Sequence, residues 1–389
     1  MWLIDNNTLL LRFVDDETVE RYVILSHTWE DGQEVTFQDM DPAPQARITN
    51  KSGFEKIRAT CRQALTDGLR YSWVDTCCID KSLDSKLSKA INSMYRWYEA
   101  ADVCYVFLAD LDLGGMTSSH RLTQQLDEKL PGCRWFTRGW TLQELVAPRR
   151  IKFFDSAWRL CGNKDDNAML QRLSQITNIP AAVLRNPEEC LPQVLAAQKM
   201  SRAAKRQTRT AEDAAYCLLG IFDINMPLIY GEGGREAFLR LQEEIIRKTK
   251  DFSLFAWEVD DSFEIHGVFA KSPAAFIHSS KIVPSDNAPT RSFSDALVVV
   301  SGLLGISGVP MVMVESLLLG ESRILHETFA LPCRDRDLGN IFLPVCRTID
   351  GYYRSSPKLV KRHGLQPNNS LADCGLDFYR ISTTNNIAL

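Results

Sequence analysis

Four short apolar runs alternate with amphipathic segments over the first 160 residues of the chain. In the amphipathic segments the apolar residues recur every three or four positions, as they do on one face of a helix. The apolar runs are short and continuous, which is typical of strands that are covered on both faces. We therefore expect strands at 21–26, 70–80, 102–110 and 150–155, and helices at 53–68, 85–101 and 138–148.

Strands that alternate with helices in this way predict right-handed crossovers and a mostly parallel sheet. The expected fold is α/β, with a flavodoxin-like, mostly parallel sheet flanked by helices. Ligands of such sheets bind beyond the carboxyl ends of the strands. In this chain those ends are Ser26-His27-Thr28-Trp29, Asp75-Thr76-Cys77-Cys78 and Ala109-Asp110.

The pattern changes twice after the last of these strands. From 161 to 258 the apolar spacing is helical, and beyond 259 the chain is rich in Val, Ser, Gly and Pro. Strand-like runs in that last part lie at 295–300, 310–314, 326–331 and 340–346. A chain of 389 residues is long enough for two or three domains. We predict three parts, an α/β core at 1–160, a helical extension at 161–258 and a β-rich C-terminal domain at 259–389.

Charge and hydropathy exclude several classes of protein. The net charge of −4 gives no overall attraction to nucleic acid, and a basic stripe at Arg202, Lys205, Arg206 and Arg209 is more typical of a solvated face or a protein contact. The most apolar stretch, 296–314, contains three Gly and one Pro, which favours buried strands over a membrane span. The N-terminal segment carries Asp5, Asp15, Asp16 and Glu17 and no basic leader, so we expect a cytoplasmic protein without a signal peptide.

The eleven cysteines show no metal-binding pattern. Their number is odd, no C-x-x-C pair occurs, and the adjacent Cys77 and Cys78 have no partners at zinc spacing. We expect reduced, mostly buried thiols and no metal site.

The stretch RGWTLQELVAP (138–148) places a carboxylate in an unusual position. On a helix Leu142, Leu145 and Val146 share one face, while Trp140 and Glu144, four residues apart, lie together on the opposite face. The polar insert 111–133 leads from the third strand end into this helix, so Glu144 is expected near the ligand crevice. A solvated Glu144 paired with Arg138, Arg149 or Arg150 is the alternative, and the spacing alone leaves both open.

A glycine-rich segment, PLIYGEGGREAF (227–238), runs from an apolar stretch into a helical pattern. Such a segment can hold a phosphate at a helix N-terminus. It lacks the Lys and the Ser or Thr of a P-loop, so a tight turn into the helix is the favoured interpretation.

Five ordered blocks of the chain resemble the HET domain, the module of fungal heterokaryon incompatibility proteins, over roughly residues 1–258. The resemblance implies a role in self/non-self recognition, in which an activated domain triggers cell death. The blocks are YVILSHTW (22–29), GLRYSWVDTCCIDK (68–81), INSMYRWYEAADVCYVFLAD (91–110), WFTRGWTLQELVAPRRIKFFD (135–155) and AEDAAYCLLGIFDINMPLIYGEGGREAFLRLQEEI (211–245).

HET domains are distantly similar to TIR domains, some of which cleave NAD. The TIR order is a strand ending in Ser, a helix containing Ala-Ile, a buried strand and a helix that bears the catalytic glutamate. The segments 25–26, 87–93, 103–109 and 140–145 follow this order. The resemblance therefore implies that Glu144 takes the position of the glutamate. Two segments differ from the TIR pattern, His27-Thr28-Trp29 after the first strand and CCIDKSLDSK after the second.

Cleavage of the nicotinamide–ribose bond develops positive charge on the ribose, which a lone ionised carboxylate at Glu144 can stabilise. NAD is then a substrate, and no cofactor or metal is required. Further contacts to the substrate are expected from Ser26, His27, Trp29, Asp75, Arg138 and Trp140.

Two other functions stay open. One is a non-catalytic scaffold that signals by homotypic assembly, and the other is a hydrolase that pairs His27 with Cys77 or Cys78. In the enzyme and scaffold interpretations we expect a homo-oligomer and a protein trigger whose identity the residues do not show.

Overall fold

The computed structural model describes most of the first 284 residues and parts of the remainder. The chain divides into two compact units, Met1–Asp251 with Lys271–Ser280, and Phe252–Ala270 with the residues from Lys281 on. The three-part division made from the sequence stays a prediction. The described residues are 1–15, 21–40, 49–114, 119–259, 269–284, 297–300, 303–306, 312–319, 322–348, 351–354 and 360–362.

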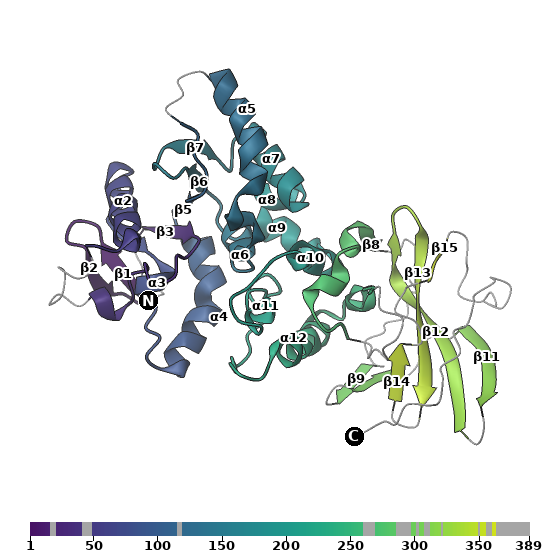
Figure 1. Ribbon diagram of the computed structural model, residues 1–389. Helices are drawn as coiled ribbons and strands as arrows, with labels where there is room; N and C mark the ends of the chain where they lie inside the picture. Colours follow the sequence, from purple (N-terminus) through teal and green to yellow (C-terminus); the bar gives the residue numbers. More distant parts are fainter. Residues whose placement is uncertain are drawn as a thin grey trace. The chain divides into compact units, whose positions relative to one another are not determined.

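The first unit is built on a seven-stranded mixed sheet (Figure 1). Its four central strands are parallel to one another, whereas the strands at both edges pair antiparallel. The order across the sheet is β2 (Leu10–Phe13), β1 (Trp2–Asp5), β4 (Tyr71–Trp73), β3 (Tyr22–His27), β5 (Val103–Phe107), β6 (Ile151–Phe154) and β7 (Leu160–Asn163).

The expectation of a mostly parallel sheet is therefore correct for the centre and wrong for the edges. The four central strands are the four that the sequence predicts, and their order, second–first–third–fourth along the chain, is that of flavodoxin-like sheets. The sequence did not reveal β1, β2 and β7, because each spans four residues and carries too little alternation to stand out.

The second predicted strand is too long. Strand β4 ends at Trp73, and the rest of the apolar run forms a short helix, α3 (Asp75–Cys78), in which the amide of Cys78 donates to the carbonyl of Val74 at 2.8 Å. Because a short apolar run is compatible with strand or helix, periodicity could not locate this boundary. The other three central strands agree with their predicted positions to within about three residues at each end.

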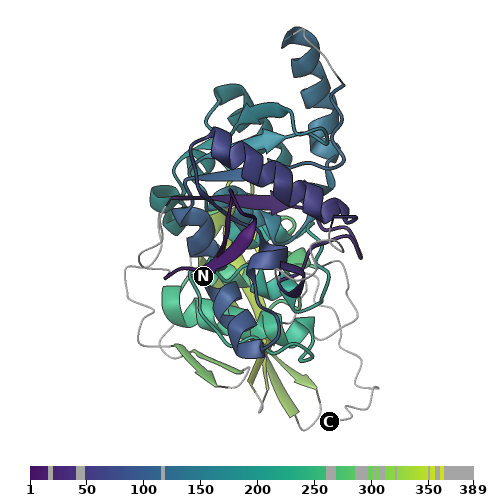
Figure 2. The same cartoon turned by 90° about the vertical axis from the view of Figure 1, so that its left-hand side faces the viewer.

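The helices around the sheet follow from the direction of its crossovers. The chain moves from β3 to β4 in one direction and from β4 past β3 to β5 in the other, so right-handed crossovers put α2 (Ser52–Thr66) and α4 (Asp84–Ala100) on opposite faces (Figures 1 and 2). Helix α6 (Thr141–Val146) packs against α4 and β3. The face of the sheet that carries α4 therefore also carries Glu144.

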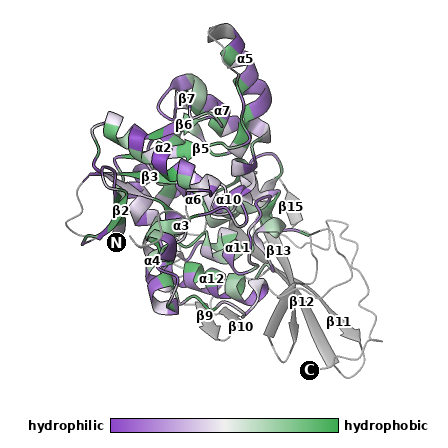
Figure 3. Cartoon of the chain, turned by 60° about the vertical axis from the view of Figure 1, so that its left-hand side comes forward, coloured by the Kyte–Doolittle hydropathy of each residue, from purple (hydrophilic) through white to green (hydrophobic). Residues whose placement is uncertain are grey.

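The rest of the first unit is mainly helical, as the spacing over 161–258 predicts. Hydrophobic and hydrophilic residues are interspersed along its helices (Figure 3), and in the last helix Phe238, Leu241 and Ile245 are buried. The helices are α5 (Ser119–Lys129), α7 (Asn167–Thr177), α8 (Ala181–Arg185), α9 (Pro187–Cys190), α10 (Ala196–Ala203), α11 (Asp213–Tyr216) and α12 (Gly234–Thr249).

In its described parts the second unit contains antiparallel strands that overlap the predicted runs. Residues 295–296 and 310–311 of those runs lie outside the described residues, as do Asp16 and Glu17 of the N-terminal segment. The strands are β8 (Ile282–Pro284), β9 (Leu297–Val300), β10 (Leu303–Ile306), β11 (Val312–Leu319), β12 (Ser322–Asp335), β13 (Gly339–Thr348), β14 (Gly351–Arg354) and β15 (Val360–Arg362).

The expected state of the thiols can be checked at nine cysteines. All nine are free, and all except Cys190 are buried. The Cys346 side chain and Cys374 lie outside the described residues. Over the described ranges no group of His, Cys, Asp and Glu is arranged to hold a metal ion, and no helix there is long and apolar enough to cross a membrane.

Candidate functional site

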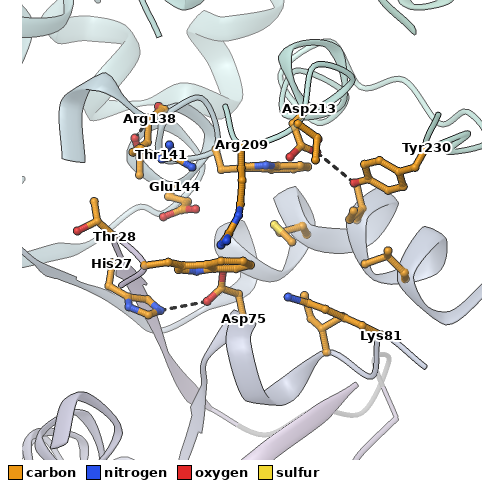
Figure 4. A pocket seen from close by; sticks show the side chains of 17 residues that line it. His27, Thr28, Asp75, Lys81, Arg138, Thr141, Glu144, Arg209, Asp213 and Tyr230 are labelled. Carbon is orange, nitrogen blue, oxygen red and sulfur yellow. Dashed lines mark hydrogen bonds and ion pairs between the residues drawn. The ribbon is translucent and has the colours of Figure 1, made fainter. Parts of the chain in front are cut away.

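A cavity of about 230 Å³ lies at the carboxyl ends of β3 and β4 (Figure 4). Segments far apart in the sequence form its wall, including the residues after β3, helices α3 and α4, helix α6 and the loops before α11 and α12. The lining residues are His27, Thr28, Trp29, Asp75, Ile79, Lys81, Leu87, Ile91, Met94, Arg138, Trp140, Thr141, Glu144, Arg209, Thr210, Asp213 and Tyr230.

Six of the seven site residues expected from the sequence line this one cavity. The seventh, Ser26, is completely buried behind the wall. Lys81, Arg209, Asp213 and Tyr230 also line the cavity, but we did not single them out as site residues from the sequence. The last three belong to the helical extension, and only the tertiary fold brings their segments close to the ends of the strands.

Glu144 is buried, with 6% of its surface exposed, and its carboxyl group lies at the cavity (Figure 4). The Ser26 hydroxyl donates a hydrogen bond to Glu144 Oε2 and accepts one from Trp135 Nε1 at 2.7 Å. All six residues of α6 are buried, so the face that Trp140 and Glu144 share is not open to bulk solvent. Ser26 thus contributes to the site by holding Glu144 in place.

The solvated interpretation of Glu144 is wrong. Arg149 pairs instead with Glu188, with nitrogen–oxygen distances of 2.5–3.0 Å, and Arg150 Nε donates to the carbonyl of Asp102 at 2.8 Å. Within the described part of the chain, Glu144 forms no ion pair with either of them or with Arg138.

Burial of Glu144 and the nearby negative charge of Asp75 raise the pKa of Glu144 to about 8. Hydrogen bonds from Ser26 and Tyr98 and the positive charge of Arg206 act in the opposite direction but do not cancel these effects. A pKa of about 8 means that Glu144 is mostly protonated at pH 7. The sequence predicted a lone ionised carboxylate instead. Asp75 lies more than sixty residues before Glu144 in the chain, so the sequence does not show that the two carboxyl groups are close in space.

The raised pKa predicts how the stability of the fold depends on pH. Between the ordinary value of 4.5 and about 8, the folded chain binds more protons at Glu144 than the unfolded chain does. The stabilisation is fully present below pH 4.5 and is lost as the pH rises to 8. We expect the free energy of unfolding of wild type to fall relative to that of Glu144→Gln from pH 5 to pH 8 in urea titrations. Parallel profiles for the two proteins would contradict a buried, proton-binding Glu144.

A second group of contacts involves His27, Asp75 and Trp29. His27 Nε2 lies 3.1 Å from Asp75 Oδ1, and Trp29 Nε1 donates to Asp75 Oδ2 at 3.0 Å. Burial acts to raise the pKa of Asp75, but these hydrogen bonds and the charges of His27 and Lys81 outweigh it and lower that pKa. His27 Nδ1 is buried and, within the described residues, has no hydrogen-bond partner. The pair thus provides an ionised carboxylate and an imidazole with one unused nitrogen.

Two cationic side chains from remote segments hold the ends of α6. Lys164 Nζ donates to the carbonyls of Leu145, Val146 and Pro148 at 3.0, 3.4 and 2.6 Å, and its residue is only 1% exposed. At the other end Arg206 Nη1 donates to the Arg138 carbonyl at 2.8 Å and to Thr141 Oγ1 at 3.0 Å. A helix of six residues has little stability of its own, so these contacts fix the position of Glu144.

The basic stripe predicted at 202–209 does not exist as one solvated helix face. Helix α10 ends at Ala203, and Arg206 beyond it turns inward to hold α6. Arg209 lines the cavity and pairs with Asp31 at 2.8 Å. Helical spacing suggested a stripe because a pattern of basic residues does not show where a helix stops.

The glycine-rich segment is a tight turn into a helix, as favoured from the sequence, and not a phosphate cradle. The amides of Gly231 and Gly233 donate to Glu212 Oε1 at 3.0 and 3.1 Å, so a carboxylate of the chain itself occupies the place of an anion. Gly233 has φ of 91°, which favours glycine, and α12 begins at the next residue.

The thiols of Cys77 and Cys78 are not placed to act as nucleophiles. Both are buried, and neither lines the cavity. A hydrogen bond with Cys78, burial and nearby negative charge raise the pKa of Cys77 well above its usual range. A protonated, enclosed thiol does not support the Cys–His hydrolase interpretation.

Comparisons with known proteins agree with the resemblance found in the sequence. Residues 22–130 match the heterokaryon incompatibility protein (HET) family, and residues 236–295 match a domain of unknown function (DUF8212). The chain is 43% identical over 230 residues to vegetative incompatibility protein HET-E-1 of Podospora anserina, an alignment that covers 58% of this chain and 16% of that relative. No solved structure matches the chain. Residues 22–130 therefore resemble a HET domain, and the chain is similar to a small part of the much longer HET-E-1.

Proposed function

We propose that this chain is an effector of fungal non-self recognition that cleaves the nicotinamide–ribose bond of NAD. Vegetative incompatibility, which the name of HET-E-1 records, supports the first part of the proposal. The second part is supported by one observation above all, the buried Glu144 carboxyl group at a cavity beyond the ends of parallel strands. Glu144 is the proposed catalytic carboxylate.

The reaction converts NAD and water into ADP-ribose, nicotinamide and a proton. As the bond from ribose C1′ to the ring nitrogen breaks, its electron pair stays with nicotinamide, which leaves as a neutral molecule without a general acid. Positive charge then develops on the ribose, and ionised Glu144 stabilises it until water adds to C1′.

The raised pKa of Glu144 is compatible with this role because NAD itself carries a positive charge on its nicotinamide ring. A cation in the cavity favours the ionised form of Glu144, whereas Asp75 favours the protonated form. Binding of NAD therefore lowers the pKa of Glu144. The proton lost from the attacking water is the proton that the reaction releases to solvent, since His27 Nε2 is bound to Asp75 and its other ring nitrogen is enclosed.

The remaining wall offers groups suited to the rest of the substrate. Trp140 and Trp29 present indole rings for stacking with planar rings, and the Arg138 guanidinium can bind a phosphate. We also propose that the chain acts in the cytoplasm as a homo-oligomer and that another protein triggers it.

The experiment that tests this proposal measures free nicotinamide after concentrated, purified chain is incubated with NAD, with and without a crowding agent. We expect release by wild type and by Cys78→Ala, because Cys78 lies outside the cavity wall. A wild type that releases none, even in the crowded samples, would contradict NAD cleavage and favour the non-catalytic assembly scaffold. If Cys78→Ala releases no nicotinamide although circular dichroism shows that it is folded, the result would favour the Cys–His hydrolase.

A further inference from the structure

Three cationic side chains from separate segments line the cavity. Lys81 lies beyond α3, Arg138 precedes α6 and Arg209 precedes α11. In Figure 4 the ammonium group of Lys81 and the guanidinium group of Arg209 are directed into the cavity. The charge of Lys81 helps to keep Asp75 ionised, but the proposed reaction at Glu144 gives Arg209 no task.

The partners of these cations leave them accessible to an anion. The Lys81 ammonium lies 4.3 Å from the centre of the Trp29 ring, and within the described residues Lys81 and Arg138 have no carboxylate at ion-pair distance. Arg209 pairs with Asp31, but both side chains are mostly exposed, at 59% and 83%. An exposed pair of this kind contributes little stability and exchanges readily for another anion.

The carboxylates of the cavity, in contrast, already have donors. Asp75 accepts hydrogen bonds from His27 and Trp29, and Asp213 Oδ1 accepts one from the Tyr230 hydroxyl at 3.1 Å. Their charges are therefore partly compensated. Lys81 and Arg209 can therefore attract a ligand that carries several negative charges.

We propose that Lys81 and Arg209, together with Arg138, form a subsite for the pyrophosphate of a dinucleotide. This inference rests on the proposed function and adds a basis for substrate selection, since the cavity would favour NAD and ADP-ribose over nicotinamide riboside. A guanidinium can donate two parallel hydrogen bonds to one phosphate, and Lys81 adds a point charge that the Trp29 ring helps to hold in place.

The test measures binding of ADP-ribose by calorimetry, since ADP-ribose carries the pyrophosphate but no bond that the proposed reaction breaks. We expect Lys81→Gln and Arg209→Gln each to weaken binding about tenfold, the loss typical of one hydrogen bond to a charged group. Arg58→Gln is the matched control, because Arg58 is also an exposed arginine in a surface ion pair, with Glu55, and lies on α2 outside the cavity. Its affinity for ADP-ribose should equal that of wild type.

A second ligand separates a subsite from a general loss of structure. Binding of nicotinamide, which lacks the pyrophosphate and has no bond that the proposed reaction breaks, should be the same in wild type, Lys81→Gln and Arg209→Gln. Wild-type affinity for ADP-ribose in either variant, an equal loss for both ligands, or no binding of ADP-ribose to wild type would overturn the subsite.

The two proposals can fail separately. A chain that binds ADP-ribose through Lys81 and Arg209 but releases no nicotinamide contradicts the reaction and supports the subsite. A chain that releases nicotinamide at the same rate with and without these two side chains supports the reaction and contradicts the subsite.

Discussion

Glu144→Gln is expected to reduce nicotinamide release by about 10²–10³-fold, the loss typical of removing one preorganised electrostatic group from an active site. Gln is close to Glu in size, and its amide oxygen can still accept the hydrogen bond from Ser26. The variant therefore removes the negative charge with little change in packing. Ionised Glu144 also attracts the positive ring of bound NAD, so KM should rise. The larger loss is expected in kcat, because the charge on the ribose grows only as the bond breaks.

Glu188→Gln is the matched control for this experiment. Glu188 is also a glutamate with an arginine close by, but it is exposed and lies outside the cavity. Its removal should leave the rate of nicotinamide release unchanged. A Glu144→Gln variant that retains a tenth or more of the wild-type rate would exclude Glu144 as the catalytic carboxylate.

Lys164→Met is expected to lower the free energy of unfolding by about 2–4 kcal/mol. Three carbonyls at the end of α6 lose a charged donor in a buried region, and each unsatisfied group costs about 1–3 kcal/mol. Burial also lowers the pKa of Lys164 to about 8, which shows that burying its charge is unfavourable. Removal of the charged group relieves this burial cost and offsets part of the loss at the carbonyls. Urea denaturation at pH 7 measures the difference.

Lys86→Met provides the comparison for Lys164→Met. Lys86 pairs with Asp80 at 2.6 Å, but its side chain is half exposed, so its loss should cost less than about 1 kcal/mol. Equal stabilities for the two variants would mean that Lys164 does not hold α6. If Lys164 does hold it, the folded fraction of Lys164→Met should also release nicotinamide more slowly, since Glu144 is no longer fixed.

Much of the first unit could be predicted from local pattern. Continuous apolar runs indicated the four central strands, and the handedness of crossovers placed their carboxyl ends at one edge. The shared edge is enough to group His27, Trp29 and Asp75. The edge strands and α3 do not stand out in the sequence, because a segment of about four residues contains at most two periods of a strand repeat and about one helical turn.

The amino-acid sequence by itself determined the central strands, the helices between them and the segments that carry the candidate site, because side-chain periodicity is a local property. Only the tertiary structure decided the environment of Glu144. Ser26 lies 118 residues before it, and Asp75, Lys164 and Arg206 come from three other segments. Burial and Coulomb interactions depend on distance in space, and no spacing along the chain records which remote charges will meet.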